Sequence, residues 1–156
     1  MIIDHIGIVV KDLEAGIAHW RDVFGYSQLT DVVVNKRQKV KVVFLEKKDS
    51  ILIKLVTPLD KTSPVHAFAR RGGGLHHLCF KCNNLEQELQ RLKAHDLRVL
   101  VPPQPGEAFA NENIAFLFAK MGLNIELIDT DKKAGLKVGR EGVDAEPLAK
   151  GENTAQ

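Results

Sequence analysis

The sequence lacks a surplus of charge of either sign and is poor in aromatic residues. Its 22 lysines and arginines nearly balance its 20 aspartates and glutamates, for a formal charge of +2 in 156 residues, and aromatics make up 6% of the chain. A surface that binds nucleic acid is usually a basic stripe with interleaved aromatic side chains. The sequence contains no such stripe, so we expect no nucleic-acid partner.

Long apolar runs are also missing. A helix that crosses a bilayer needs roughly 18 or more consecutive apolar residues, and no run in this chain approaches that length. The first residues do not have the basic region, apolar stretch and small-residue cleavage site of a secretion signal. We therefore expect a cytoplasmic protein with no membrane partner. Its 44% hydrophobic content is ordinary for a globular domain.

Cysteine is scarce, and its two copies do not indicate a redox or zinc site. Cys79 and Cys82 form a single C-x-x-C pair. A zinc site would need a second pair of ligands, and a thioredoxin-like motif would lie at a helix start. This pair lies in a strand-like pattern, where a spacing of three residues puts the thiols on opposite faces. We expect two reduced cysteines, as is normal in the cytosol.

What the sequence does contain is an internal repeat. The segment Asp4–Ile8 (DHIGI) is matched 72 positions later by His76–Phe80 (HHLCF), and the same offset relates Ile51–Leu55 to Leu123–Leu127. A single offset over this length leaves no net insertion between the copies. Two copies of one module that face each other would form one cleft, to which each copy contributes equivalent side chains.

Each copy predicts the order β-α-β-β-β. In the first copy, the apolar pattern predicts a strand over 2–10, a helix over 11–23, and strands at 28–34, 40–45 and 51–56. In the second copy, we expect a strand at 75–82, a helix at 85–95, and strands at 98–101, 113–119 and 123–129. The predicted fold class is therefore α+β, with paired β-α-β-β-β modules that form a curved mixed sheet around one cleft.

The domain organisation follows from the same repeat. We expect one domain over residues 1–130, made of module one (2–58), a linker helix (63–72) and module two (74–130). Residues 131–156 are rich in Lys, Gly, Glu and Ala and have little apolar periodicity. They are typical of a polar C-terminal tail, mobile or draped over the surface.

Three connecting segments carry further local signals. Ser63-Pro64 is typical of a helix start, with the serine as N-cap and the proline in the first turn. The glycine run 72–74 does not have P-loop spacing and precedes a strand, so we interpret it as a flexible hinge between the modules. The polar, proline-rich segment between Val101 and Asn113 predicts an irregular loop.

Strand periodicity places four polar side chains in the cleft. If the apolar residues of each first strand pack on the helices, His5 and His77 face the other way, and His76 faces the packing side or the surface. The same parity in the last strands directs Lys54 and Glu126 into the cleft. Two imidazoles and a carboxylate are a common ligand set for a divalent first-row cation, which can polarise a carbonyl. We therefore predict a metal site at His5, His77 and Glu126.

Lys54 is the repeat counterpart of Glu126 and leaves two interpretations open. A protonated lysine cannot be a ligand, and a dication would repel it. Either the metal binds through three protein ligands and water, with Lys54 turned aside or hydrogen-bonded to substrate, or Lys54 pairs with Glu126 and replaces the charge of the cation. Val42, Phe44 and Phe116 should add an apolar wall that contacts a small organic substrate together with Lys54.

These segments resemble the vicinal-oxygen-chelate (glyoxalase/bleomycin-resistance) superfamily, and within it the methylmalonyl-CoA epimerases. The resemblance rests on residues 4–8, 63–68, 74–80, 103–106, 114–117 and 125–127. It implies a homodimer that holds a divalent ion (cobalt, nickel, manganese or zinc) on histidines of the first strands and acids or amides of the last. It also implies 1,1-proton transfer, in which the metal binds an oxygen of an acyl thioester and stabilises an enediolate while a carboxylate removes the α-proton.

Two positions depart from the pattern of those epimerases. Lys54 stands where they place a Gln or Glu, and Val42 lies nearest to the position where some of them carry a carboxylate as base. Proton transfer would then use Glu126 or Lys54 as the catalytic groups. We expect a metal-dependent enzyme that resembles an epimerase or isomerase. The alternatives are a metal-free small-molecule binding or resistance protein, and a related lyase or isomerase of a biosynthetic pathway.

Overall fold

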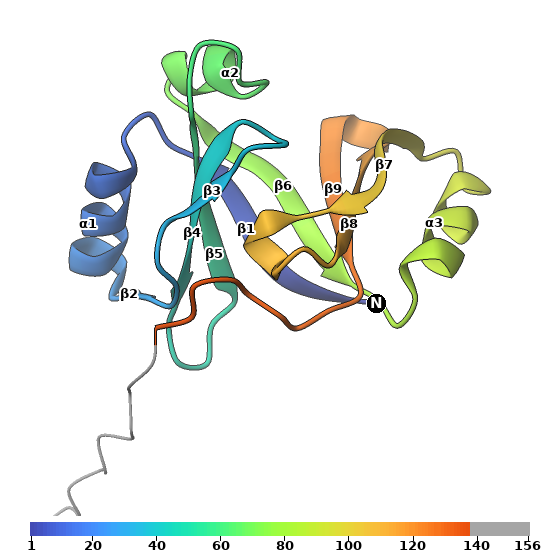
Figure 1. Cartoon of the computed structure of the whole chain (residues 1–156), viewed down its shortest axis with the longest axis horizontal. Helices are drawn as coiled ribbons and strands as arrows, with labels where there is room; N and C mark the ends of the chain where they lie inside the picture. Colours follow the sequence, from blue (N-terminus) through green and yellow to red (C-terminus); the bar gives the residue numbers. More distant parts are fainter. Residues whose placement is uncertain (138–156) are drawn as a thin grey trace, which may run out of the picture.

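The computed structural model describes residues 1–137. Their strands form one curved sheet, and a helix lies on the outer side of each half (Figure 1). Module one consists of β1 (Ile2–Val9), α1 (Leu13–Phe24), β2 (Ser27–Gln28), β3 (Val33–Asn35), β4 (Val40–Glu46) and β5 (Leu52–Pro58). A short helix, α2 (His66–Arg70), connects it to module two. Module two consists of β6 (Gly74–Lys81), α3 (Leu85–Lys93), β7 (Arg98–Pro105), η1 (Glu107–Phe109), β8 (Asn113–Ala119), η2 (Lys120–Gly122) and β9 (Leu123–Ile128).

The strands form a nine-stranded sheet in which the two modules meet at its centre. The order is β2-β4-β5-β1-β6-β9-β8-β7, with β3 paired to β4. The first strands, β1 and β6, run antiparallel to each other, and each runs parallel to the last strand of its own module, β5 or β9. Both halves are therefore built in the same way. The predicted duplication and curved mixed sheet are confirmed.

Equivalent caps begin the two long helices. The side chain of Asp12 accepts a hydrogen bond from the Ala15 amide at 2.9 Å, and that of Asn84 accepts one from the Gln87 amide, also at 2.9 Å. Each cap satisfies an amide that the first helical turn leaves unpaired, which stabilises a helix by about 1 kcal/mol. Because the caps are repeat counterparts, both helices begin at the same distance from the strand that precedes them.

The core divides into three apolar clusters, of which two lie beneath the helices. Leu13 and Ile17 of α1 pack on β4 and β5, and Leu89 of α3 packs on β8 and β9. The third cluster lies between the two halves and includes Phe44 and Phe109. The sheet therefore buries both of its faces, and the inner face is shared by the two modules.

Three local predictions about structure are wrong. The single strand expected over residues 28–34 is two short strands, β2 and β3, and residues 29–32 belong to neither. Residues 102–105, expected in a loop, extend β7 to Pro105. A proline is tolerated there because β7 is an edge strand, and its pairing with β8 shifts register between Val101 and Gln104. Helix α2 is capped at Val65 rather than at Ser63, because the Ser63 carbonyl accepts the His66 amide at 3.0 Å in a turn that precedes the helix.

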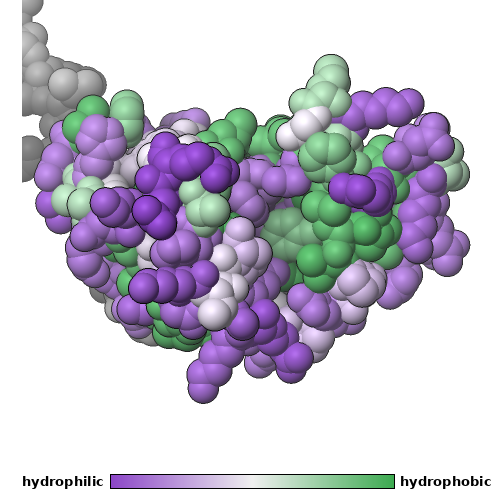
Figure 2. All heavy atoms as spheres, turned by 90° about the horizontal axis from the view of Figure 1, so that it is seen from above, coloured by the Kyte–Doolittle hydropathy of each residue, from purple (hydrophilic) through white to green (hydrophobic). Residues whose placement is uncertain are grey.

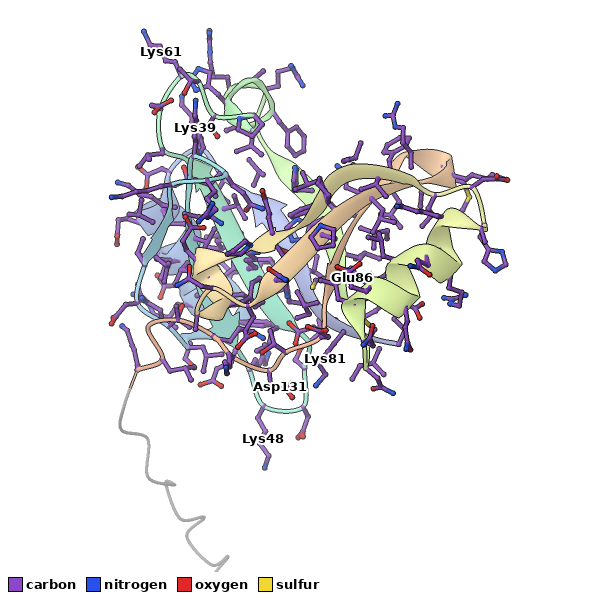
Figure 3. All side chains as sticks on the ribbon, turned by 45° about the vertical axis from the view of Figure 1, so that its right-hand side comes forward. Lys39, Lys48, Lys61, Lys81, Glu86 and Asp131 are labelled. Carbon is purple, nitrogen blue, oxygen red and sulfur yellow. The ribbon has the colours of Figure 1, made fainter. Side chains whose placement is uncertain are left out.

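The segment that follows β9 returns across the molecule and joins the two modules. Within it, the Ala134 amide donates to the Ala108 carbonyl at 3.0 Å, and the Lys137 amide donates to the Leu29 carbonyl at 3.1 Å. At its start, Asp131 points toward Lys81 of β6 (Figure 3). The expected C-terminal tail is thus packed over residues 131–137, and its remainder, 138–156, lies outside the described residues. Among the described helices, none has the length and apolar character needed to cross a membrane.

Gly73 allows the chain to pass against β1 at the junction of the modules. Its φ is +69°, and a Cβ at this position would lie 2.1 Å from the carbonyl oxygen of Val9. The neighbouring Gly72 also has a positive φ, +112°, but a Cβ there would meet nothing within 4 Å. Interpreting the glycine run only as a flexible hinge does not account for this close approach.

We therefore predict that Gly73→Ala destabilises the protein more than Gly72→Ala. Both substitutions place a side chain at positive φ, which costs about 1–2 kcal/mol, but only the first also forces backbone atoms apart. Urea unfolding of the two variants beside the wild type measures the difference. Equal losses of unfolding free energy would show that Val9 moves away without cost.

Candidate functional site

An ion pair between Lys54 of β5 and Glu126 of β9 lies where the two modules meet. The Lys54 ammonium donates to both carboxylate oxygens of Glu126, at 3.0 Å each. The two side chains are 3% and 0% exposed. Water therefore screens the pair very little, and the attraction between the charges is strong. Because the two residues are repeat counterparts, each module contributes one member of the pair.

His5 of β1 and His77 of β6 complete the cluster around the same carboxylate. Their Nε2 atoms lie 2.9 and 3.1 Å from Oε2 of Glu126, and 3.4 Å from each other. Both rings are buried. The structure thus brings together the four polar residues that strand periodicity placed in the cleft.

A glycine on the neighbouring strand makes room for the His77 ring. Gly7 of β1 pairs with His77, and a Cβ at Gly7 would lie 2.0 Å from the ring atom Cε1. Any side chain at this position would displace the imidazole. Sequence reasoning did not single out Gly7, although a glycine inside a strand pattern is a recognised sign that another group approaches closely.

Two β-bulges direct a further side chain onto each histidine. In the pairing of β1 with β6, the register shifts between Ile3 and His5 and again between Gly7 and Ile8. These shifts leave Asp4 on β1 and His76 on β6 as the extra residues, and a bulge re-aims the side chain it carries. Asp4 and His76 are repeat counterparts, so the same irregularity occurs once in each module.

The bulged residues hold the outer nitrogens of the two rings. Nδ1 of His5 lies 2.7 Å from Oδ2 of Asp4, and Nδ1 of His77 lies 2.8 Å from Nδ1 of His76. Asp4 is itself paired with Lys133 of the C-terminal segment, at 3.3 Å. The expectation that His76 faces packing or the surface is therefore wrong, because strand alternation is broken at this residue.

The surroundings fix the charge of the central groups. Burial lowers the pKa of His77 to about 4, so its ring is neutral at pH 7. Burial alone would raise the pKa of Glu126, but the charge of Lys54 and the contacts with the two histidines outweigh it and hold this pKa well below its usual value. Glu126 is therefore a carboxylate at neutral pH.

A cavity of about 310 Å³ adjoins this cluster. Lys54, His76 and His77 line it, together with the apolar Val42 and Phe116. Seen from above, apolar residues gather around the hollow between the two halves of the molecule (Figure 2). The fold therefore gives an organic ligand access to Lys54.

Three of the expected site residues lie behind this cavity and do not line it. His5 and Glu126 are fully buried. Phe44, expected in the substrate wall, packs edge-on against the His5 ring with 5.2 Å between ring centroids. A ligand in the cavity therefore reaches the cluster from the side of Lys54 and the two neighbouring histidines of β6.

The distances among the donor atoms of His5, His77 and Glu126 fit a divalent ion, but the positive charge of the neighbouring Lys54 does not. Donor atoms bound to one metal at about 2.1 Å lie roughly 3.0–3.5 Å apart, close to the separations of 2.9, 3.1 and 3.4 Å among His5, His77 and Glu126. Within the described residues these three side chains can be grouped as metal ligands. The Lys54 ammonium, however, already occupies both oxygens of Glu126. As arranged, the four side chains do not fit a dication.

Comparisons of the sequence and of the structure with known proteins point to the same family. Residues 4–118 match the model of the Glyoxalase/Bleomycin resistance protein/Dioxygenase superfamily. The uncharacterized protein YqjC of Bacillus subtilis is 34% identical over 130 residues, which cover 81% of this chain and 91% of that protein. The ethylmalonyl-CoA/methylmalonyl-CoA epimerase of Cereibacter sphaeroides is 29% identical over 120 residues, which cover 76% and 88% of the two chains.

A solved structure extends the likeness to three dimensions. A variant of the Streptomyces coelicolor methylmalonyl-CoA epimerase, in complex with 2-nitronate-propionyl-CoA, matches with a TM-score of 0.72 at 28% identity. The match covers 83% of this chain and 96% of that one. The two proteins thus share one fold, and that relative is in complex with an acyl-CoA analogue.

The neutral state of His77 predicts a loss of stability in mild acid. The unfolded chain takes up a proton near pH 6.5 and the folded protein only near pH 4, so the stability present above pH 6.5 is lost as the pH falls. We expect the free energy of unfolding to drop by on the order of 1–2 kcal/mol between pH 6.5 and pH 5. Urea titrations at each pH would measure this drop.

His77→Gln should flatten this dependence, whereas the exposed His19→Gln should leave it unchanged. Burial also lowers the pKa of His76, so this residue accounts for the pH dependence of the unfolding free energy that remains in His77→Gln. An undiminished slope in His77→Gln would contradict the assignment.

Proposed function

The chain belongs to the Glyoxalase/Bleomycin resistance protein/Dioxygenase superfamily, and from that premise we propose that it is an enzyme of the epimerase or isomerase type. The reaction is proton transfer at the carbon next to the carbonyl of an acyl thioester. The epimerase relatives and the acyl-CoA analogue bound by one of them support this substrate class. The observation that carries the proposal is a buried ammonium group, Lys54, in the wall of an apolar cavity.

Lys54 is suited to stabilise negative charge on a carbonyl oxygen. An ammonium group has three N–H donors, and both oxygens of Glu126 lie on one side of it at 3.0 Å. A donor that points away from Glu126 would contact a ligand in the cavity that Lys54 lines. A charged donor that is fixed in place and shielded from water stabilises a developing oxyanion more than water does, because it needs no reorganisation. Glu126, behind the cavity, holds this donor in position.

The proton balance closes without an oxidant or a second substrate. The α C–H bond breaks, its electron pair forms the carbon–carbon double bond of the enolate, and the carbonyl oxygen takes the negative charge beside Lys54. The proton passes to Nε2 of His76, a neutral imidazole that lines the cavity, and solvent supplies the proton for the other face of the carbon. Return of a proton to the other face of the same carbon completes an epimerisation.

The cavity lining supports a substrate with an alkyl acyl group. Val42 and Phe116 form apolar walls, and Gln104 and Asn124 add neutral polar groups. Arg37 also lines the cavity and supplies a positive charge for an anionic part of the ligand. This combination of apolar walls and a few polar groups is typical of a small-molecule site.

A metal-free binding protein is the second candidate, and one observation favours it. The Lys54–Glu126 pair satisfies both carboxylate oxygens internally, as expected of a site that holds a ligand without reacting with it. Such a protein would bind the same acyl thioesters and leave their α-protons in place. Binding and proton exchange must therefore be measured together.

We predict that the wild type exchanges the α-proton of 2-methyl acyl thioesters for deuterium in D₂O. Removing one oxyanion donor typically lowers the rate by roughly 100–1000-fold, so the exchange rate of Lys54→Met, assayed with a chelator that keeps the site free of metal, should fall by that factor. Lys48→Met, at the exposed β4–β5 turn labelled in Figure 3, is the matched control and should retain the wild-type rate. NMR of the recovered thioester measures the exchange.

Two outcomes would decide against the enzyme. Exchange by Lys54→Met at the wild-type rate in the presence of a chelator would remove Lys54 from the reaction. Tight binding of the same thioesters by the wild type without any exchange would instead establish the binding protein.

A further inference from the structure

The charge of the central cluster is complete without an added ion. Lys54 balances Glu126, and Lys133 balances Asp4 on the other side of His5. All four side chains are at most 9% exposed. A dication placed among them would add two uncompensated positive charges where water cannot screen them.

Lys54 is also held by more than its carboxylate partner. Its ammonium lies 4.8 Å from the ring centroid of Phe109 and 5.7 Å from that of Phe44, within the range of cation–π attraction. A lysine that left Glu126 to admit an ion would lose these contacts as well. The rings of Phe44 and Phe109 therefore help to hold the ammonium of Lys54 beside Glu126.

The rest of the cluster, by contrast, keeps the features of a chelating site. The three donor atoms have metal-like spacing, and each histidine has its Nδ1 held by a bulged residue, Asp4 or His76. Partners of this kind, at the outer nitrogen of a ring, orient the inner nitrogen toward a metal. Of the four side chains His5, His77, Glu126 and Lys54, only Lys54 therefore opposes a dication.

We propose that the Lys54 ammonium has taken the place and the charge of a divalent cation, so that the wild-type protein works without a bound metal. The inference has two consequences. The positive charge that faces the cavity is covalently attached, and chelators do not remove it. Removal of that charge alone restores a metal site at His5, His77 and Glu126.

The test compares the metal content of four forms of the full chain. Wild type, Lys54→Arg, Lys54→Gln and Lys54→Met are each incubated with Co²⁺, Ni²⁺, Mn²⁺ or Zn²⁺, desalted and measured by mass spectrometry of the metal. Lys54→Arg keeps the charge and is the matched control. We expect wild type and Lys54→Arg to hold no stoichiometric metal. Lys54→Gln and Lys54→Met should hold one ion per chain, bound roughly 100-fold or more tightly than by the wild type.

Further readouts tie the ion to this site. Co²⁺ bound to Lys54→Gln should give a visible d–d spectrum and raise Tm, because it binds the folded state alone. Both signals should disappear in Lys54→Gln/His77→Ala. If the neutral variants fail to fold without metal, the wild type still decides the matter. One metal ion per wild-type chain, lost in His5→Ala, would overturn the proposal, and so would folded Lys54→Gln and Lys54→Met that acquire no metal.

This inference deepens the proposed function, yet the two can fail separately. Metal analysis needs no substrate, so a metal-free wild type that exchanges no α-proton would remove the enzymatic proposal and leave the inference standing. A wild type that exchanges protons only with a stoichiometric metal would do the reverse. Exchange that persists at the full rate after treatment with a chelator supports both.

Discussion

The ion pair between Lys54 and Glu126 is the interaction on which the site depends. The pair joins β5 to β9, the two strands that flank the central β1–β6 pairing, and it buries a charge from each module. Removing one partner from such a pair typically costs about 3–5 kcal/mol, because the other charge remains buried alone. The positions of His5 and His77 follow from it, since both rings converge on the same carboxylate. The same ion pair therefore joins the two modules, orients the two histidine rings and balances the buried charges.

Divergence within a symmetric scaffold gives this site its polarity. The duplication supplies each inward position twice, and His5 and His77 are a polar pair that is identical in the two modules. Lys54 and Glu126 diverged to opposite charges, so that equivalent positions attract each other across the junction. Asp4 and His76 diverged as well, and each still contacts the histidine beside it through an equivalent bulge. The two modules thus have similar backbones, but His5 has an acidic neighbour, Asp4, and His77 has a neutral one, His76.

Sequence reasoning recovered what depends on periodicity and failed where local geometry breaks it. A repeat at a fixed offset and alternation along strands were enough to predict the paired modules and to place Lys54 and Glu126 on one face. Alternation could not reveal the bulges, because an extra residue in a strand has no signature in apolar spacing. For that reason His76 was assigned to the wrong side. Lys133 lies in a segment with no periodic pattern, and only the hydrogen bonds of that segment bring it to Asp4.

A tethered ammonium and a metal ion differ in the ligand they select. A metal with open positions can hold two oxygens of one substrate at once. Lys54 is one compact ammonium group with Glu126 on one side and diverging N–H donors, so it stabilises one oxygen of a ligand better than two neighbouring ones. A substrate that relies on chelation by two neighbouring oxygens gains little from such a site. A substrate whose reaction concentrates negative charge on a single thioester oxygen is fully stabilised by such a site. If lysine replaces the charge of a metal as proposed, the scaffold would therefore favour enolates that bear one oxyanion.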